Sequence, residues 1–305
     1  IVNSWMAYPN QIAISEIALT PDNSKLLTAG SNGQAILWNL NNHQLITEFS
    51  KIGSNMRTID ISPDGKTAII GYTNGEITLV SLVSGEDMQS CPLNGHTNSV
   101  NSVRFSPNGK FAVSGANDYN VVMWDLATCK KEGTLLFRHD SWVTALAFSP
   151  DGKLLASASG DGTLVVWNLD AGQQIYRLGL TELDTNYGLD AFALSIDFSP
   201  DGRLLSASYA NGNVAIWSAT NGILLRKFIA FPTNTCSYGT HCFWALNVRF
   251  SKISNELWSS SADGQIHVWP LIQGFSPAEL RAWLTQNRYI YELTAQEKDA
   301  YDINK

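Results

Sequence analysis

Segments in which hydrophobic and polar residues alternate recur along the chain, and turn signals separate them. In one stretch, Val143 to Phe148 alternates and leads into Ser-Pro-Asp-Gly, and Leu154 to Ser159 leads into Asp161-Gly162. Two further segments follow, Thr163 to Leu169 and Gln174 to Leu178. Alternation with a period of two is typical of strands with one buried face, and Asp-Gly favours a two-residue hairpin. The stretch therefore predicts four short antiparallel strands.

The same arrangement occurs six times. Ser-Pro-Asp-Gly or a relative of it recurs, and seventeen residues after its second position stands an aromatic or large apolar residue. These pairs are Pro21 and Trp38, Pro63 and Val80, Pro107 and Trp124, Pro150 and Trp167, Pro200 and Trp217, and Lys252 and Trp269. Six residues before each end point stands Asp or Asn, followed by Gly in five of the six copies. Four short strands every ~45 residues predict one blade of a β-propeller per repeat.

These residues resemble WD repeats. The third copy ends Val122-Met123-Trp124-Asp125-Leu126 after a leading Gly95-His96, and the resemblance covers roughly residues 12–271. It implies an all-β propeller of four-stranded antiparallel blades. We expect repeats near residues 12–50, 56–92, 96–136, 139–178, 190–228 and 243–271, within a propeller domain spanning 1–273.

Six copies favour six blades, although seven is the commonest number in the resembling family. The sixth copy has no recognisable fourth strand after Pro270-Leu271. Ile1 to Met6 could supply that strand and close the ring, which would also remove an exposed sheet edge. Alternatively, residues preceding Ile1 carried another blade. The start at Ile1 without Met or a signal segment indicates a processed protein or a piece of a longer one.

The resemblance also implies a structural tetrad in each blade, which pairs a His with an Asp, a Ser or Thr, and the Trp. Two copies hold all four residues, and the other four copies lack the His. The complete tetrads are His96, Ser114, Asp118 and Trp124, and His139, Ser157, Asp161 and Trp167. Buried His and Asp side chains need such partners, because an unpaired buried polar group costs several kcal/mol.

Residues 274–305 are expected to form a helical tail. Ser276-Pro277-Ala278-Glu279 is typical of a helix start, with Pro at the first helical position. Leu280, Trp283 and Leu284 then form an apolar stripe, which is expected to pack as a cap on the propeller. The phrase around Asn287-Arg288-Tyr289 is similar to tails that follow WD repeats in large bacterial signalling proteins.

Composition excludes several classes of protein. No apolar run approaches the ~18 residues of a membrane-spanning helix, and the net charge of -7 disfavours nucleic acid as a partner. The four cysteines are too few for a disulfide-stapled scaffold. We expect four free thiols in a reducing cytoplasm, although Cys236 and Cys242 are close enough to pair if the compartment allowed it.

Candidate chemistry is sparse. The chain has no nucleophile elbow, zinc-protease motif, phosphate loop or dinucleotide fingerprint. Cys236, His241 and Cys242 do not match a zinc layout, and the segment from Asp184 to Asp190 lacks the Glu and Gly positions of an EF-hand. We therefore predict no catalytic residues, no metal and no cofactor, and a protein that is not an enzyme.

Aromatic residues suggest a docking surface instead. The residues that stand seven positions before the first residue of each phrase are Ala13, Asn55, Ser99, Trp142, Phe192 and Trp244. In the WD-repeat resemblance these positions open the innermost strands on the face where partners commonly dock. The long loops before the fifth and sixth repeats belong to the same sector. The aromatics that these loops and the blade-five hairpin add are Tyr187, Tyr209, Tyr238 and Phe243.

Desolvated Trp and Tyr side chains are frequent binding hot spots. The sequence therefore predicts a scaffold or sensor module, part of a larger bacterial signalling protein, that docks a protein or peptide around blades four to six. The alternative for these aromatics is packing on their own loops. The alternative function is a propeller hydrolase or lyase at the central opening, which would need converging polar groups where the innermost strands look mostly small or apolar. Single-stranded nucleic acid suits the aromatics but not the acidic charge.

Overall fold

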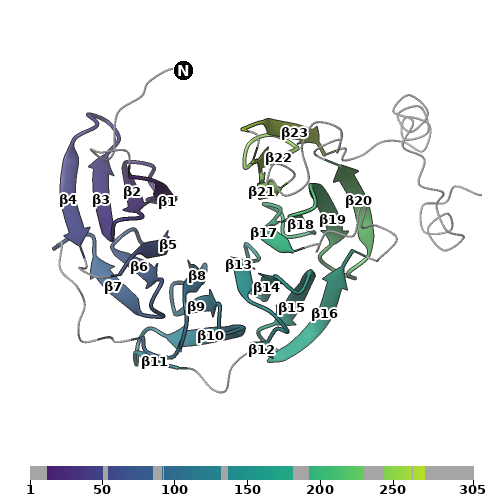
Figure 1. Cartoon of the computed structure of the whole chain (residues 1–305), viewed down its shortest axis with the longest axis horizontal. Coiled ribbons are helices and arrows are strands. Elements are labelled where there is room, and N and C mark those ends of the chain that lie inside the picture. The colour runs from purple at the N-terminus through teal and green to yellow at the C-terminus, as the bar shows by residue number, and fades with distance from the viewer. Residues whose placement is uncertain are drawn as a thin grey trace, which may run out of the picture.

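A computed structural model describes residues 12–50, 54–84, 91, 93–131, 137–180, 192–229, 244–262 and 264–271. Within these ranges the chain forms antiparallel sheets, and no helix is long and apolar enough to cross a membrane. Six sheets follow one another in chain order along an arc (Figure 1). The all-β propeller architecture predicted from the repeats is confirmed.

The strands of the first sheet are β1 (Ile14–Leu19), β2 (Lys25–Gly30), β3 (Gln34–Asn39) and β4 (Leu45–Ser50). Those of the second are β5 (Met56–Ile61), β6 (Thr67–Tyr72) and β7 (Ile77–Ser81). Those of the third are β8 (Val100–Phe105), β9 (Phe111–Ala116), β10 (Asn120–Asp125), β11 (Lys130–Lys131) and β12 (Phe137–Arg138).

The strands of the fourth sheet are β13 (Val143–Phe148), β14 (Leu154–Ser159), β15 (Thr163–Asn168) and β16 (Gln173–Gly179). Those of the fifth are β17 (Ala193–Phe198), β18 (Leu204–Tyr209), β19 (Asn213–Ser218) and β20 (Leu224–Ile229). Those of the sixth are β21 (Ala245–Phe250), β22 (Glu256–Ser261) and β23 (Ile266–Pro270). In the third sheet, β11 and β12 both pair with β10 and together occupy the fourth-strand position.

The Ser-Pro-Asp-Gly phrase forms the turn between the first two strands of a sheet. In the second sheet, Ser62 Oγ donates to Asp64 Oδ1 at 2.6 Å, and the same oxygen accepts the N–H of Lys66 at 3.0 Å. Gly65 has a φ of 71°, which a residue with a Cβ rarely adopts. The hydrogen bond from Ser62 lowers the pKa of the Asp64 carboxyl. The phrase therefore specifies its own turn through local contacts.

Adjacent sheets pack face to face, and apolar side chains fill the space between them. Leu164 and Val166 of the fourth sheet belong to one buried cluster with Ile196 and Phe198 of the fifth. The six innermost strands contact one another in succession along the arc, in the order β1, β5, β8, β13, β17 and β21. We call each such interface between adjacent sheets a seam. Each Å² of apolar surface buried there contributes ~25 cal/mol to the free energy of unfolding, so the seams are a major source of stability.

Four of the five seams between innermost strands carry a hydrogen bond from a backbone N–H to a side-chain acceptor, and these four bonds run in one direction. In each of the four, a side chain on one sheet accepts a backbone N–H of the next sheet along the chain. The pairs are Glu16 with Ile59 at 2.9 Å, Thr58 with Val103 at 3.1 Å, Ser102 with Leu146 at 3.2 Å, and Ser195 with Val248 at 3.4 Å. These acceptors occupy equivalent positions, five residues before the second position of their phrases. In the fifth seam, between β13 and β17, Thr144 Oγ1 instead donates to the Ala193 carbonyl at 2.6 Å.

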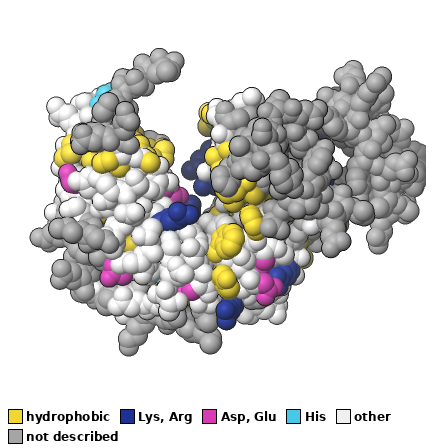
Figure 2. All heavy atoms as spheres, in the orientation of Figure 1, with side chains coloured by type: hydrophobic (Ala, Val, Ile, Leu, Met, Phe, Trp, Pro, Cys, Tyr) yellow, Lys and Arg dark blue, Asp and Glu magenta, His cyan; other side chains and the backbone are white. Residues whose placement is uncertain are grey.

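Among the described residues, no strand lies between the first and sixth sheets (Figure 1), and this space is called the opening of the arc. Ala18 packs toward the second sheet, whereas its neighbour Ile17 is 59% exposed on the other face of β1. In the sixth sheet Leu257 packs toward the fifth sheet, while Trp258 is 47% exposed. Figure 2 shows hydrophobic side chains on both sides of this opening. The predicted closing strand, Ile1 to Met6, lies outside the described residues, as does the predicted helical tail.

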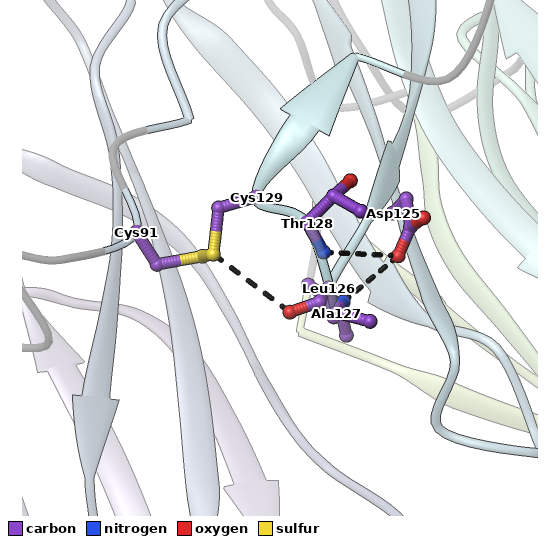
Figure 3. Close-up of a disulfide and its surroundings, with 6 residues drawn as sticks. All are labelled: Cys91, Asp125, Leu126, Ala127, Thr128 and Cys129. Atoms are coloured by element: carbon purple, nitrogen blue, oxygen red, sulfur yellow. Dashed lines mark hydrogen bonds between the residues drawn. A yellow bond between two sulfur atoms is a disulfide. The ribbon is translucent and has the colours of Figure 1, made fainter.

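A disulfide joins Cys91 to Cys129, with the two Cα atoms 5.0 Å apart (Figure 3). Cys91 lies in the apolar cluster between the second and third sheets, and Cys129 lies in the turn after β10. The prediction of free thiols is wrong for this pair, because their separation of 38 residues conceals a proximity that only the packing of two sheets creates. Disulfides persist mainly in oxidising compartments, so the cysteines no longer support the predicted cytoplasmic location. Cys236 and Cys242 lie outside the described residues.

Candidate functional site

The aromatic positions singled out in the sequence occupy the same place on every sheet. In each case the backbone carbonyl of that residue accepts an N–H from the end of the second strand. The carbonyls of Trp142, Phe192 and Trp244 accept from Gly160 at 2.9 Å, Ala210 at 2.9 Å and Ala262 at 3.1 Å. Ala13, Asn55 and Ser99 make the same bond in the first three sheets. The fourth to sixth sheets therefore present aromatic residues at equivalent points, next to the start of their innermost strands.

Trp142 is held in place by its neighbours. Its side chain is 38% exposed, and its ring centroid lies 5.2 Å from that of Phe192. A Cβ at Gly160 would come within 2.5 Å of the indole Cε2, so the indole requires glycine at that position. The equivalent residue of the fifth sheet is Ala210, which shows that the fold itself does not demand glycine there. Trp142 and Phe192 thus form an aromatic pair on the surface between the fourth and fifth sheets.

The other predicted docking residues differ in accessibility. Trp244 is partly exposed. Tyr209 is fully buried, packs on Trp217 with centroids 6.4 Å apart, and has its pKa raised by burial. Because its side chain faces the core from the end of β18, we remove Tyr209 from the predicted docking surface. Tyr187, Tyr238 and Phe243 lie outside the described residues, as do most of the two long loops.

The four residues of the third-sheet tetrad lie within hydrogen-bonding distance of one another. His96 Nδ1 donates to Asp118 at 2.9 Å, and its Nε2 lies 2.7 Å from Ser114 Oγ. The indole N–H of Trp124 donates to Ser114 Oγ at 2.8 Å. Burial alone would raise the pKa of Asp118, but the hydrogen bonds from His96 and two backbone N–H groups outweigh it and lower the pKa to about 2. The carboxylate is therefore held in its charged form.

The fourth-sheet tetrad connects to the aromatic surface. His139 Nδ1 donates to Asp161 at 3.1 Å, and its Nε2 lies 2.8 Å from Ser157 Oγ. Asp161 also accepts the backbone N–H of Asp140 at 3.1 Å, which fixes the segment leading to Trp142. Hydrogen bonds from His139 and Thr163 overcome the effect of burial and hold the pKa of Asp161 well below its usual value. Trp167 is buried in the same sheet. The tetrad thus anchors the segment that leads to Trp142.

A cavity of about 300 Å³ lies beside this segment and is lined by Tyr119, Arg138, His139 and Asp140. Tyr119 has a φ of 74°, whereas the corresponding hairpin positions of the other sheets hold glycines with positive φ: Gly33, Gly75, Gly162, Gly212 and Gly264. A left-handed backbone costs a residue with a Cβ roughly 1–2 kcal/mol. The sequence contains the signal for this site, because Tyr119 is the one interruption of the Asp/Asn-Gly pattern, but its importance was missed.

Charged side chains converge at the central opening, contrary to the expectation of small or apolar residues there. Asp60, Arg104, Asp197 and Arg249 all stand three residues before the second position of their phrases. Arg104 pairs with Glu16 at 2.9 Å. A cavity of about 170 Å³ is lined by Glu16, Asp60, Arg104 and Arg249, among others. Their shared offset from the phrases is the signal in the sequence that could have predicted this convergence.

The carboxylates of this cluster are already bonded within the propeller. Asp60 accepts the N–H of Phe105 at 2.7 Å, and Asp197 accepts the N–H of Phe250 at 2.8 Å. Loss of water raises the pKa of both carboxyl groups, against the opposing effect of Arg104 on Asp60 and of Arg249 on Asp197. Among the described residues, no group of three His, Cys, Asp or Glu is placed to hold a metal ion. The cluster thus connects neighbouring blades. Cys236, His241 and Asp184, which the sequence disfavours as metal ligands, lie outside the described residues.

Comparison with known families agrees with this geometry. A family model described as the second β-propeller of echinoderm microtubule-associated protein matches residues 16–187, more than half of the chain. A model of the WD domain, G-beta repeat, matches residues 188–218. The chain belongs to the WD-repeat β-propeller family. This WD-repeat chain thus keeps the family pattern through the fourth and fifth sheets, where the aromatic pair lies.

Several eukaryotic proteins contain stretches similar to this WD-repeat chain. It is 33% identical to U3 small nucleolar RNA-associated protein 12 of Saccharomyces cerevisiae, over 34% of the chain and 11% of that protein. It is 27% identical to WD repeat and FYVE domain-containing protein 2 of Caenorhabditis briggsae, over 45% of the chain and 32% of that protein. It is 29% identical to small ribosomal subunit protein RACK1 of Caenorhabditis elegans, over 39% of the chain and 36% of that protein. The matches thus span between about a tenth and a third of these relatives.

Proposed function

We propose that this WD-repeat propeller is a non-enzymatic scaffold or sensor module that docks a protein or peptide on the face around its fourth to sixth sheets. The observation that carries the proposal is the Trp142–Phe192 pair, which is partly exposed and held in a fixed geometry by Gly160. Rigid aromatic side chains contribute large contact areas at little entropic cost, which is why Trp and Tyr dominate binding hot spots. Trp244 extends the same surface to the sixth sheet.

The proposal includes a larger polypeptide. The similarity of the Asn287-Arg288-Tyr289 segment to tails of large bacterial WD-repeat signalling proteins supports fusion to signalling domains. The predicted partners are therefore a protein or peptide and other domains of the same polypeptide, with neither nucleic acid nor a membrane as partner. The net charge of -7 supports the exclusion of nucleic acid.

A comparison of three chains tests the docking surface. The wild type, the double variant Trp142→Ala plus Trp244→Ala, and the control Trp258→Ala are used to capture proteins from a lysate of the source cells, with quantification by mass spectrometry. Trp258 is an exposed tryptophan on β22, outside the aromatic face, so it controls for the general loss of an indole. We expect the double variant to lose specific partners at least ten-fold, since each truncated hot spot costs ~2 kcal/mol.

Circular dichroism establishes that the variants are folded. If the double variant captured every partner as well as the wild type does, the proposed surface would be wrong. The alternative, a hydrolase or lyase at the central opening, draws on Glu16, Asp60 and Asp197, but these carboxylates already accept hydrogen bonds from neighbouring strands. Turnover of a hydrolase substrate panel, abolished by Asp60→Asn, would establish that alternative instead.

A further inference from the structure

We propose that the cavity lined by Tyr119, Arg138, His139 and Asp140 binds the carboxylate of an acidic residue in a docked peptide, while Trp142 contacts an apolar side chain of the same peptide. This inference rests on the proposed docking function and specifies its ligand. The cavity and Trp142 belong to one short segment, because Asp140 is separated from Trp142 by a single residue. One peptide can therefore reach both.

The backbone of Tyr119 is the first reason to assign a ligand here. Five hairpins place glycine at this position, and the third places an aromatic residue with a φ of 74°. Non-glycine residues held in this region cluster at binding and catalytic sites, where the side chain has a use that offsets the strain. Within the described part of the chain the backbone of Tyr119 is hydrogen-bonded, but its hydroxyl makes no hydrogen bond, and its ring lies against Arg138. The tyrosine thus forms a platform for a cation.

Arg138 supplies the charge. Its guanidinium carbon lies 5.6 Å from the centroid of the Tyr119 ring. The backbone of Arg138, on β12, lies opposite Asn120 of β10 in the antiparallel pairing of these two strands. The side chain is exposed, and no described residue supplies a hydrogen-bond acceptor or an ion pair to it. A guanidinium presents its donors as a planar fork that fits the two oxygens of a carboxylate. Stacking on Tyr119 holds that fork ready.

The remaining polar groups of the cavity are already engaged. Both ring nitrogens of His139 contact the tetrad, one with Asp161 and one with Ser157. Asp140 pairs with Arg177 at 2.9 Å, and Arg177 also lies 3.4 Å from Asp161. Arg138 is therefore the charged side chain lining the cavity that has no ion-pair partner among the described residues, and its guanidinium favours an anionic ligand. A peptide carboxylate pairs with this charge, and an apolar side chain of the same peptide can pack against Trp142.

Peptide selection tests the proposal with the full chain. A displayed library of random dodecapeptides is selected on the wild type, on Arg138→Gln and on the control Arg203→Gln, and the recovered peptides are sequenced. Arg203 is an exposed arginine in a phrase turn of the fifth sheet, away from the cavity. We expect the wild type and the control to enrich Asp and Glu next to a large apolar residue, and Arg138→Gln to lose that enrichment.

Calorimetry with one enriched peptide, its Glu→Gln analogue and its phosphoserine analogue measures the charge preference. We expect Glu→Gln in the peptide, or Arg138→Gln in the protein, to weaken binding about ten-fold, as loss of a charge-assisted hydrogen bond does. If the phosphoserine peptide bound more tightly than the Glu peptide, the ligand group would be a phosphate and the carboxylate assignment would be overturned.

The outcomes separate this inference from the proposed function. Peptides that need Trp142 but show neither acidic enrichment nor sensitivity to Arg138→Gln would refute the carboxylate site and leave the docking surface standing. If no selected peptide lost binding when Trp142 was replaced by Ala, both the carboxylate site and the docking surface would be refuted. Acidic peptides whose binding is weakened by Trp142→Ala and also by Arg138→Gln would establish the docking surface and the carboxylate site.

Tyr119→Gly provides a readout that a structural role would not give. Glycine adopts a positive φ without strain, so we expect the variant to keep or raise the thermal midpoint while it weakens peptide binding several-fold. A variant with a lowered midpoint and unchanged affinity would show that the tyrosine serves only the fold, and would overturn its role as a platform.

Discussion

Gly160 determines the shape of the surface around Trp142 because it lacks a side chain. The indole occupies the space that a Cβ at position 160 would take. Alanine stands at the equivalent position of the fifth sheet, so the requirement for glycine arises from the tryptophan and not from the strand. A residue on one strand thus fixes the rotamer of an aromatic at the start of another.

Gly160→Ala should therefore displace the Trp142 indole. We expect a red shift of tryptophan fluorescence and a loss of unfolding free energy of about 1–3 kcal/mol, as in other over-packed sites. Gly179→Ala is the matched control, because the nearest atom to its added Cβ is 3.6 Å away. Identical emission spectra for the two variants would contradict the close packing of Trp142 on Gly160.

Asp118 gives the tetrad a dependence on pH. Its pKa in the folded chain is lowered to about 2, so the folded state holds the charged form more strongly than the unfolded state does. The stabilisation is present above pH ~4 and is lost as the pH falls toward 2. We expect Asp118→Asn to cost about 1–2 kcal/mol at pH 7 and progressively less on acidification. Urea unfolding of both chains between pH 7 and 2.5 measures the difference, and a pH-independent gap would refute the assignment.

At the scale of elements, local signals could be predicted and contacts between sheets could not. Ser62, Asp64 and Gly65 form their turn through bonds within the phrase, so the sequence alone indicated it. Trp142 and Phe192 could be assigned to one surface because the fixed spacing places them at equivalent points. Cys91 and Cys129 meet only because two sheets pack together.

The same distinction explains the remaining errors. The sequence places Tyr209 next to a hairpin, which predicts a surface position. Side chains alternate between the two faces of β18, however, and that of Tyr209 lies on the face that packs into the core. Arg104 and Asp60 look isolated in the sequence, and they meet only at the centre of the arc. Glu16 joins them from a third sheet. Such proximity depends on the curvature of the whole molecule, which residue spacing does not specify.

The disulfide predicts how the second and third sheets depend on each other. Closing a loop of 38 residues restricts the unfolded chain, so reduction should cost roughly 3–4 kcal/mol. We expect dithiothreitol, or Cys91→Ser plus Cys129→Ser, to lower the thermal midpoint by several degrees. Alkylation before and after reduction, read by mass spectrometry, establishes whether the pair is oxidised. A purified chain in which both thiols react without reductant would contradict the bond.

At the scale of the whole molecule, stability passes from each sheet to its neighbours along the arc. Clusters of buried side chains join adjacent sheets, as in other repeat architectures where nearest-neighbour seams dominate. The fourth sheet has a seam on each side. The first and sixth sheets each have one seam to a described sheet, and their other faces expose apolar side chains such as Ile17 and Trp258.

Hydrogen exchange should reveal this gradient. We expect the amides of β2 and β3 to exchange at least several-fold faster than those of β14 and β15, because an end sheet can open with the loss of one seam. These strands occupy the same places in their own sheets, so the comparison controls for position within a sheet. Uniform protection across all six sheets would show that the arc opens only as a single cooperative unit.

The one-way seams give the arc a polarity. Side-chain acceptors on β1, β5, β8 and β17 meet N–H groups of the following innermost strand, as Glu16 meets Ile59 and Ser195 meets Val248. By the same pattern, β1 at one end of the arc is placed to donate its backbone N–H groups to a preceding strand. At the other end, β21 is placed to offer side-chain acceptors to a following strand. Two copies meeting at these ends would join head to tail, a heterologous contact in which unlike surfaces meet. Self-assembly through the opening would thus extend as a filament or close as a ring, and a twofold-symmetric dimer would leave both seams unmatched.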